Sequence, residues 1–229
     1  MKKIICFFLS FILMFLSISA FAAGKLSTTK ENFWVINGWT TYAYAYARIE
    51  NIGNKPINVN AGVLEVYDAD GNVITSTDYM STYAKTLQPN EYTYIKLSKD
   101  INTAEDVGKP DDYMLTITGK TDDSSWTKRL PVETKLSLNE TNGWWTYDYM
   151  YVTITNNTDE TIYNISTVVV LLDDNNNILY LDDDTMYSYG LLPGNSVVLK
   201  KQISSTFMDY FKAHNITPTK VDAIAYIDN

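Results

Sequence analysis

The sequence contains very little cysteine and histidine, with one residue of each among 229. The cysteine, Cys6, lies in an apolar run at the start of the chain, so the remainder has neither disulfides nor thiol chemistry. A zinc site needs several Cys or His ligands, and this composition excludes one. The histidine, His214, has no recognisable nucleophile context around it, so we expect it to have a structural role.

Positive charge is also scarce, with 18 basic residues against 27 acidic ones and a net charge of −9. An acidic chain repels nucleic acid and anionic membranes. The segment Asp68–Asn72 has the composition of a calcium loop, but an EF-hand needs glycine at its sixth position and glutamate at its twelfth. Here Gly71 is fourth and Tyr79 is twelfth. We therefore expect a hairpin turn there and a solvated acidic edge at Asp182–Asp184, with no metal or cofactor. Calcium bound by Asp182–Asp184 is the alternative.

Only one long hydrophobic run is present, at residues 4–18. Lys2 and Lys3 precede it, and Ala20-Phe21-Ala22 follows it as a small-x-small cleavage site. This arrangement predicts a secretory signal peptide over residues 1–22, because the run is shorter than the roughly 20 residues that a spanning helix needs. We expect a secreted, periplasmic or cell-envelope protein without membrane insertion after cleavage. Export without cysteine favours a bacterial source.

Two segments repeat one pattern, in which three tyrosines alternate with other residues after an Asn-Gly pair. The first contains Tyr42, Tyr44 and Tyr46, and the second contains Tyr147, Tyr149 and Tyr151. A period of two is the spacing of side chains on one face of a β-strand. Later turns recur at nearly the same separation of about 105 residues, which indicates a tandem duplication. We predict two units that fold separately, at residues 23–131 and 132–229.

Short apolar segments bounded by turns about every ten residues predict a β-sandwich in each unit. In the first unit we expect a polar leader over residues 24–31, a first strand at Phe33–Ile36, and a closing pair formed by residues 111–118 and 125–130. In the second unit, Phe207 and Phe211 stand four residues apart within Ser204–His214. This spacing predicts a short helix, so the fold class is all-β with one helix in the second unit.

The segment from Leu64 to Asn72 reads Leu-Glu-Val-Tyr-Asp-Ala-Asp-Gly-Asn. With Lys55-Pro56 and Leu87-Gln88-Pro89 it resembles the signature of FxLYD domains, an immunoglobulin-like family of exported bacterial proteins. In the second unit, Val169–Asp173 is a weaker match, and the phenylalanine is missing from both copies. The resemblance implies two tandem immunoglobulin-like sandwiches outside the cytoplasm. It brings no catalytic residues.

The two faces of each tyrosine strand differ in polarity. The face of Tyr42, Tyr44 and Tyr46 continues to Arg48 and Glu50, whereas alanines and an isoleucine occupy the other face. A sandwich strand turns one face to the core and one to water, so we expect the tyrosines to point outward as an exposed ladder. Two alternatives are that the rings fill the core, and that a neighbouring strand or the other repeat covers them.

Exposed aromatic rows give a large contact area at low side-chain entropy, as in antibody paratopes. We therefore expect a non-enzymatic binding module for an envelope or extracellular protein, with oligomeric state left open. A carbohydrate-binding module is the alternative, since aromatic rings stack on sugars as they do on other rings, and an enzyme with an unrecognised acidic site is the third hypothesis. The candidate ligand-binding residues are Tyr42, Tyr44, Tyr46, Tyr147, Tyr149, Tyr151, Trp39, Trp144 and Trp145.

Overall fold

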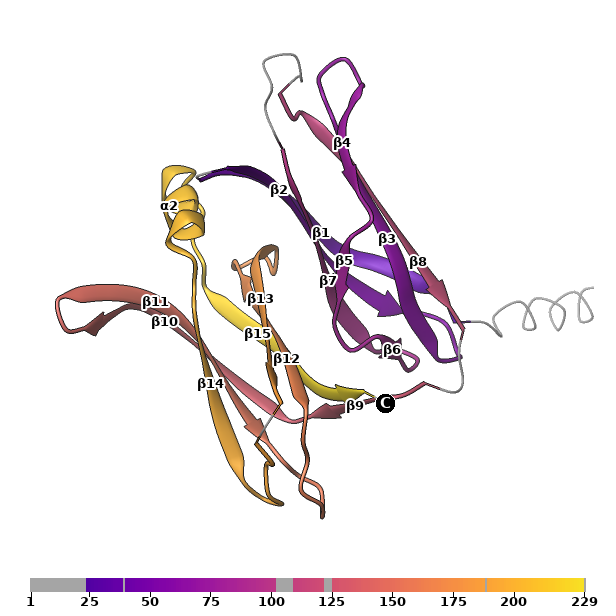
Figure 1. Cartoon of the computed structure of the whole chain (residues 1–229), viewed down its shortest axis with the longest axis vertical. Coiled ribbons are helices and arrows are strands. Elements are labelled where there is room, and N and C mark those ends of the chain that lie inside the picture. Colours follow the sequence, from indigo (N-terminus) through magenta and orange to yellow (C-terminus); the bar gives the residue numbers. More distant parts are fainter. Residues whose placement is uncertain (1–23, 39, 102–108, 122–124, 188, 229) are drawn as a thin grey trace, which may run out of the picture.

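The computed structural model describes residues 24–38, 40–101, 109–121, 125–187 and 189–228 (Figure 1). The predicted signal peptide at residues 1–22 lies outside them, as does Trp39. The described chain is all-β with one short helix, as the sequence predicts. No described helix has the length and apolar character needed to cross a membrane. The elements are β1 Leu26–Asn37, β2 Thr41–Asn51, β3 Ile57–Tyr67, β4 Val73–Thr77, β5 Met80–Thr82, β6 Thr86–Leu87, β7 Tyr92–Asp100, β8 Asp112–Lys120, β9 Thr127–Leu130, β10 Val132–Asn142, β11 Trp145–Thr155, β12 Ile165–Leu172, β13 Ile178–Met186, β14 Ser196–Gln202, α2 Ser205–Ala213 and β15 Lys220–Asp228.

Each unit is a sandwich of two antiparallel sheets, and we name the sheets by whether they lie between the units. The first unit has an inner sheet of order β1-β2-β7-β5 and an outer sheet of order β4-β3-β6, in which β8 also pairs with β3. The second unit has an inner sheet of order β13-β12-β15-β9 and an outer sheet of order β10-β11-β14. In the first unit the apolar face of β2 packs against β3, so Ala43, Ala45, Ala47 and Ile49 are fully buried with Leu64.

A buried asparagine closes the end of the tyrosine strand in the same way in both units. The side-chain amide of Asn51 donates to the carbonyl oxygens of Lys55 and Leu87, at 2.8 and 2.9 Å. The amide of Asn156 donates to those of Glu160 and Leu191, at 2.8 and 2.7 Å. Both asparagines are fully buried. Their hydrogen bonds tie two backbone carbonyls to the end of the tyrosine strand, and they fix the same turn in each unit.

Two sequence-based expectations about the first unit are wrong. Strand β1 begins at Leu26, and its first residues pair with the end of β2, so there is no polar leader there. Its polar residues are compatible with a strand because β1 is at the edge of its sheet. The expected closing pair does not form either: β8 pairs with β3, and β9 pairs with β15 of the second unit.

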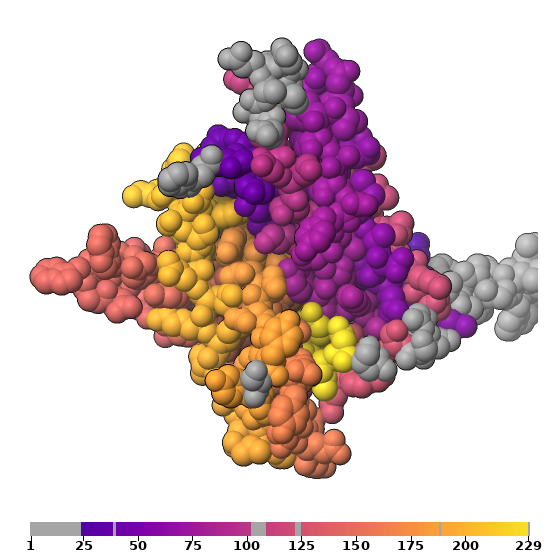
Figure 2. All heavy atoms as spheres, in the orientation of Figure 1, coloured from indigo at the N-terminus to yellow at the C-terminus, as the bar shows by residue number. Residues whose placement is uncertain are grey.

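The two units stack through their inner sheets, with no gap between them in Figure 2. Strand β12 is the centre of this arrangement, because its residues from Thr167 to Leu172 are buried on both faces. One face lies in the second unit's own core, and the other meets the first unit. The apolar cluster of the second unit therefore continues into the first, where it includes Ile36, Tyr46 and Tyr94.

Candidate functional site

The first tyrosine ladder points out of its own sandwich, as the sequence predicts, but it is not exposed to solvent. Tyr46 is fully buried, Tyr44 is partly buried, and only Tyr42, at 37% exposure, is open to a ligand. The second unit covers the rings, so the expectation of an exposed ladder is wrong in this unit and the alternative of cover by the other repeat describes it. Trp39 lies outside the described residues.

Helix α2 and strand β13 supply that cover. Phe207 of the helix packs against Tyr44, with ring centroids 5.0 Å apart, and against Tyr180 of β13 at 4.9 Å. Trp34 of β1 meets Phe211 edge-on at 5.8 Å. The spacing of Phe207 and Phe211, which predicts the helix, also gives it one apolar face for this contact.

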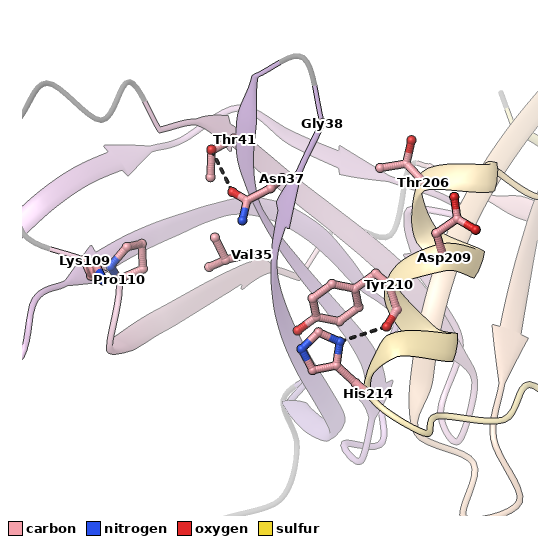
Figure 3. Close-up of a pocket in the computed structure, with 10 residues that line it drawn as sticks. All are labelled: Val35, Asn37, Gly38, Thr41, Lys109, Pro110, Thr206, Asp209, Tyr210 and His214. Atoms are coloured by element: carbon pink, nitrogen blue, oxygen red, sulfur yellow. Dashed lines mark hydrogen bonds between the residues drawn. The ribbon is translucent and has the colours of Figure 1, made fainter.

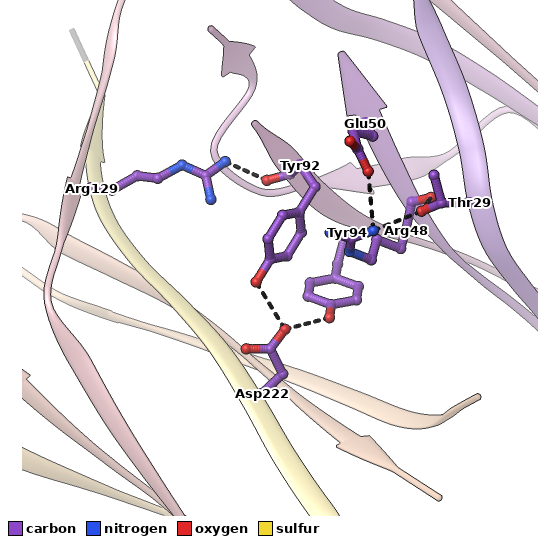
Figure 4. Close-up of polar contacts among 7 residues, drawn as sticks. All are labelled: Thr29, Arg48, Glu50, Tyr92, Tyr94, Arg129 and Asp222. Carbon is purple, nitrogen blue, oxygen red and sulfur yellow. Dashed lines mark hydrogen bonds and ion pairs between the residues drawn. The ribbon is translucent and has the colours of Figure 1, made fainter. Parts of the chain in front are cut away.

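The contact between the units also contains polar groups from strands β2, β7, β9 and β15 (Figure 4). One carboxylate oxygen of Asp222 on β15 accepts hydrogen bonds from the hydroxyls of Tyr92 and Tyr94 on β7, at 3.0 and 2.6 Å. The guanidinium of Arg48 lies 3.8 Å from the centre of the Tyr92 ring, and Arg129 of β9 donates to the Tyr92 carbonyl. Burial of polar groups is tolerated here because most of them have partners.

These surroundings raise the pKa of the interface tyrosines above the ordinary value of 10.0. Burial raises the pKa of Tyr92 to about 12, and the charge and hydrogen bond of Asp222 add to the effect against the opposing charges of Arg48 and Arg129. Burial followed by Asp222 raises the pKa of Tyr94 further. Burial and the neighbouring Asp183 likewise raise the pKa of Tyr83. All three hydroxyls therefore remain protonated donors over the ordinary pH range.

The second ladder lies on the outer sheet, but its rings are largely covered. Tyr149 is only 8% exposed, and the ammonium of Lys200 lies 3.7 Å from its ring centre. Glu140 accepts hydrogen bonds from Tyr151 and from Lys200, both at 2.6 Å. The bond from Lys200, followed by that from Tyr151, lowers the pKa of Glu140 to about 2. The ladder is thus a packed surface of tyrosines and charges, without free ring faces at Tyr149.

The hairpin that joins β10 and β11 carries the most exposed aromatic residues among the candidates that the structure describes. Trp144 is 98% exposed and Trp145 is 70% exposed. The hairpin turns at Gly143, whose φ of +64° suits glycine. Figure 2 shows this hairpin projecting beyond the rest of the molecule. We call Trp144 and Trp145 the tryptophan tip. No charged residue lies between Glu140 and Asp148.

An open cleft of about 1160 Å³ lies between β1 and helix α2 (Figure 3). The rings of Tyr210 and His214 stack with centroids 4.0 Å apart and project from α2 toward Val35 and Pro110 on the opposite side. His214 also forms a 2.8 Å hydrogen bond with the Tyr210 carbonyl through Nδ1. Asp209 lies on the helix side of the cleft.

A third aromatic surface, which no sequence pattern predicts, lies on the second unit. Tyr163, Tyr187 and Tyr189 are 57%, 75% and 77% exposed, and they belong to loops at the end of the second unit opposite the tryptophan tip. Gly190 lies against the Tyr163 ring, because a Cβ added there would stand 2.7 Å from it. The tyrosines have no strand-like period, so only the Tyr-Ser-Tyr-Gly composition of the loop could have indicated a surface of this kind.

The acidic segments make contacts within the protein. The ammonium of Lys201 lies 3.3 Å from Asp182 and 3.5 Å from Asp184. The Asp68 carboxylate accepts from the backbone N–H groups of Asp70 and Asn72, as expected of a hairpin turn. Within the described part of the chain, no three His, Cys, Asp or Glu residues are placed to hold a metal ion.

Comparison with models of protein families and with characterised proteins gives no match to this chain. The resemblance to FxLYD domains therefore rests on the quoted residues. What the protein does has to be argued from its own geometry.

Proposed function

We propose that the protein is an exported, non-enzymatic binding module that engages its ligand through the tryptophan tip. The observation that carries the proposal is the exposure of two adjacent indole rings, 98% and 70%, at the end of a projecting hairpin. Tryptophan is the residue most enriched among interface hot spots, because it buries a large area and keeps one hydrogen-bond donor. An apolar pair held in water costs free energy that binding recovers.

The geometry favours a protein partner with an apolar pocket over an extended glycan. A polysaccharide would need a row of free ring faces, and the row next to the tip is covered where Lys200 lies on Tyr149. Of the first ladder, Tyr46 is fully buried, and Tyr42 is the most exposed ring at 37%. The tip offers two rings on one narrow projection, which suits insertion into a concave site. A glycan ligand is the competing outcome of the test.

The test compares the wild type with a double variant, Trp144→Ala with Trp145→Ala. Immobilised proteins are exposed to the extracellular and envelope fractions of the producing cell, and captured partners are purified and titrated directly. A glycan array is run in parallel with the same proteins. We expect the affinity of the double variant for a purified protein partner to fall by about 100-fold or more, since each hot-spot residue contributes at least about 2 kcal/mol.

The matched control is Tyr187→Ala with Tyr189→Ala, which removes two equally exposed rings at the opposite end of the second unit. This control should bind as the wild type does. Equal capture by all three proteins would refute the role of the tip. Array binding that disappears in the tryptophan variant would instead establish the carbohydrate-binding alternative.

A further inference from the structure

We propose that the tryptophan tip of one molecule inserts into the cleft between β1 and α2 of a second copy of this chain. This inference rests on the proposed function of the tip and names its partner. It joins two features that one molecule presents separately: a projecting pair of indoles, and an open cleft of about 1160 Å³. Figure 1 shows the tip and helix α2 at separate places on the second unit.

The cleft supplies the groups that an indole needs. Tyr210 and His214 form a stacked aromatic wall, and Val35 and Pro110 provide apolar atoms on the other side. Aromatic rings prefer offset or edge-on contact with such a wall. Each indole has one N–H donor, and the Asp209 carboxylate lies within the cleft lining as an acceptor.

Charge also favours this contact over others between two copies. Like-charged chains repel each other, and the net charge here is −9. The tip is the uncharged segment between Glu140 and Asp148, so insertion brings no carboxylate of the hairpin end into the cleft beside Asp209. Salt screens the remaining repulsion between the acidic bodies. Association through the tip is therefore expected to strengthen as ionic strength rises.

The contact joins two different surfaces, so it is heterologous, and an assembly that does not close into a ring keeps one free tip and one free cleft at its ends. Two tryptophans bury about 300–500 Å² on the tip side. This area lies below the roughly 800 Å² per partner of a standard stable interface. The assemblies should consequently be weak and should grow with protein concentration.

Sedimentation velocity over a range of concentrations tests the inference on the chain without its predicted signal peptide. The tip variant is Trp144→Ala with Trp145→Ala, and the cleft variant is Thr206→Trp, which places a large ring at an exposed position of the cleft lining. We expect the wild type to associate progressively, and more strongly at high salt. The cleft variant should weaken association by about 30-fold or more, the effect of one hot-spot residue, and the tip variant, which lacks two such residues, by about 100-fold or more.

Mixing the two variants gives the decisive result. The tip variant keeps its cleft and the cleft variant keeps its tip, so together they should form a one-to-one complex that does not grow further. Tyr189→Ala, a matched exposed ring elsewhere, should associate as the wild type does. A wild type that stays monomeric at every concentration, or a cleft variant that associates normally, overturns the inference.

The outcome separates this inference from the proposed function. If the cleft variant still captures a different purified protein through its tip, the binding role of the tryptophans stands and self-association falls. If neither self-association nor capture depends on the tryptophans, both fail.

Discussion

At the scale of single residues, tyrosines of the first unit contribute both apolar area and hydrogen bonds to the contact between the units. Their rings provide apolar area between the two sandwiches, and their hydroxyls meet carboxylates of the second unit, as Tyr94 meets Asp222 and Tyr83 meets Asp183. A face of leucines would bury similar area without fixing the direction of the contact. The hydroxyls therefore specify how the units fit together.

Tyr46 gives the sharpest test of the buried ladder. Tyr46→Ala should lower the free energy of unfolding by roughly 3–5 kcal/mol, the cost typical of removing a large buried ring. Tyr46→Phe should cost less than about 1 kcal/mol, because the hydroxyl has no hydrogen-bond partner among the described residues. Urea melts measure both. A loss below 1 kcal/mol for Tyr46→Ala would show that the ring is solvated.

The pKa of Tyr92 predicts a dependence on alkaline pH. Its folded pKa of about 12 lies above the ordinary value of 10.0, so its contribution to stability is complete below pH 10 and is lost as the pH rises through 12. Asp222→Asn removes a charge that raises this pKa, so tyrosine ionisation should begin at lower pH. Ultraviolet absorbance of tyrosinate measures it.

Asp209→Asn is the matched control for that titration, because Asp209 is exposed on α2, whereas the hydroxyls of Tyr92 and Tyr94 are hydrogen-bonded to Asp222 on β15. Its titration curve should overlay that of the wild type. Identical curves for Asp222→Asn and the wild type would contradict the assigned cause of the shift.

The sequence predicts which face of the ladder strand is apolar but not what lies opposite the other face. Alternation along β2 is a local property, and it correctly places Ala43, Ala45 and Ala47 in the first core. The cover over Tyr44 and Tyr46 comes from α2 and β13, far along the chain, so no local pattern contains it. The tryptophan tip, by contrast, depends on local sequence, since the Asn-Gly pair beside Trp144 is typical of the turn of a hairpin.

At the scale of elements, β12 carried a signal that was available in the sequence. Every residue from Val168 to Leu172 is apolar, whereas the matching strand β3 alternates with Asn58, Asn60 and Glu65. A continuous apolar run is typical of a strand buried on both faces. The difference between the two strands indicates that β12 is covered on both faces, whereas β3, in the outer sheet of the first unit, is covered on one.

Strand β9 predicts where the second unit begins. It pairs with β15 from Ala225↔Leu130 to Asp228↔Thr127, and Leu130 is buried. A fragment of residues 125–229 should therefore be more stable than one of residues 132–229, which leaves an edge of β15 unpaired. Urea melts followed by circular dichroism compare them. Equal midpoints would place the boundary at Pro131 and leave β9 without a stabilising role.

At the scale of the whole molecule, the apolar cluster that runs through the second core and the contact predicts cooperative unfolding. The protein should unfold in one calorimetric transition, with equal calorimetric and van't Hoff enthalpies. Tyr46→Ala combined with Tyr94→Ala should separate it into two transitions, since both rings lie between the units. Two transitions in the wild type would mean that the units are energetically independent.

The double burial of β12 gives meaning to the order of the two units along the chain. A chain made from its N-terminus completes the first unit before β12 appears. The waiting surface is then a row of tyrosines, which water can hydrate through their hydroxyls. The run from Val168 to Leu172 emerges later and finds its cover already folded. With the units in the opposite order, the aliphatic face of β12 would be exposed to water until the other unit had folded. The present order therefore protects the newly made chain from aggregation.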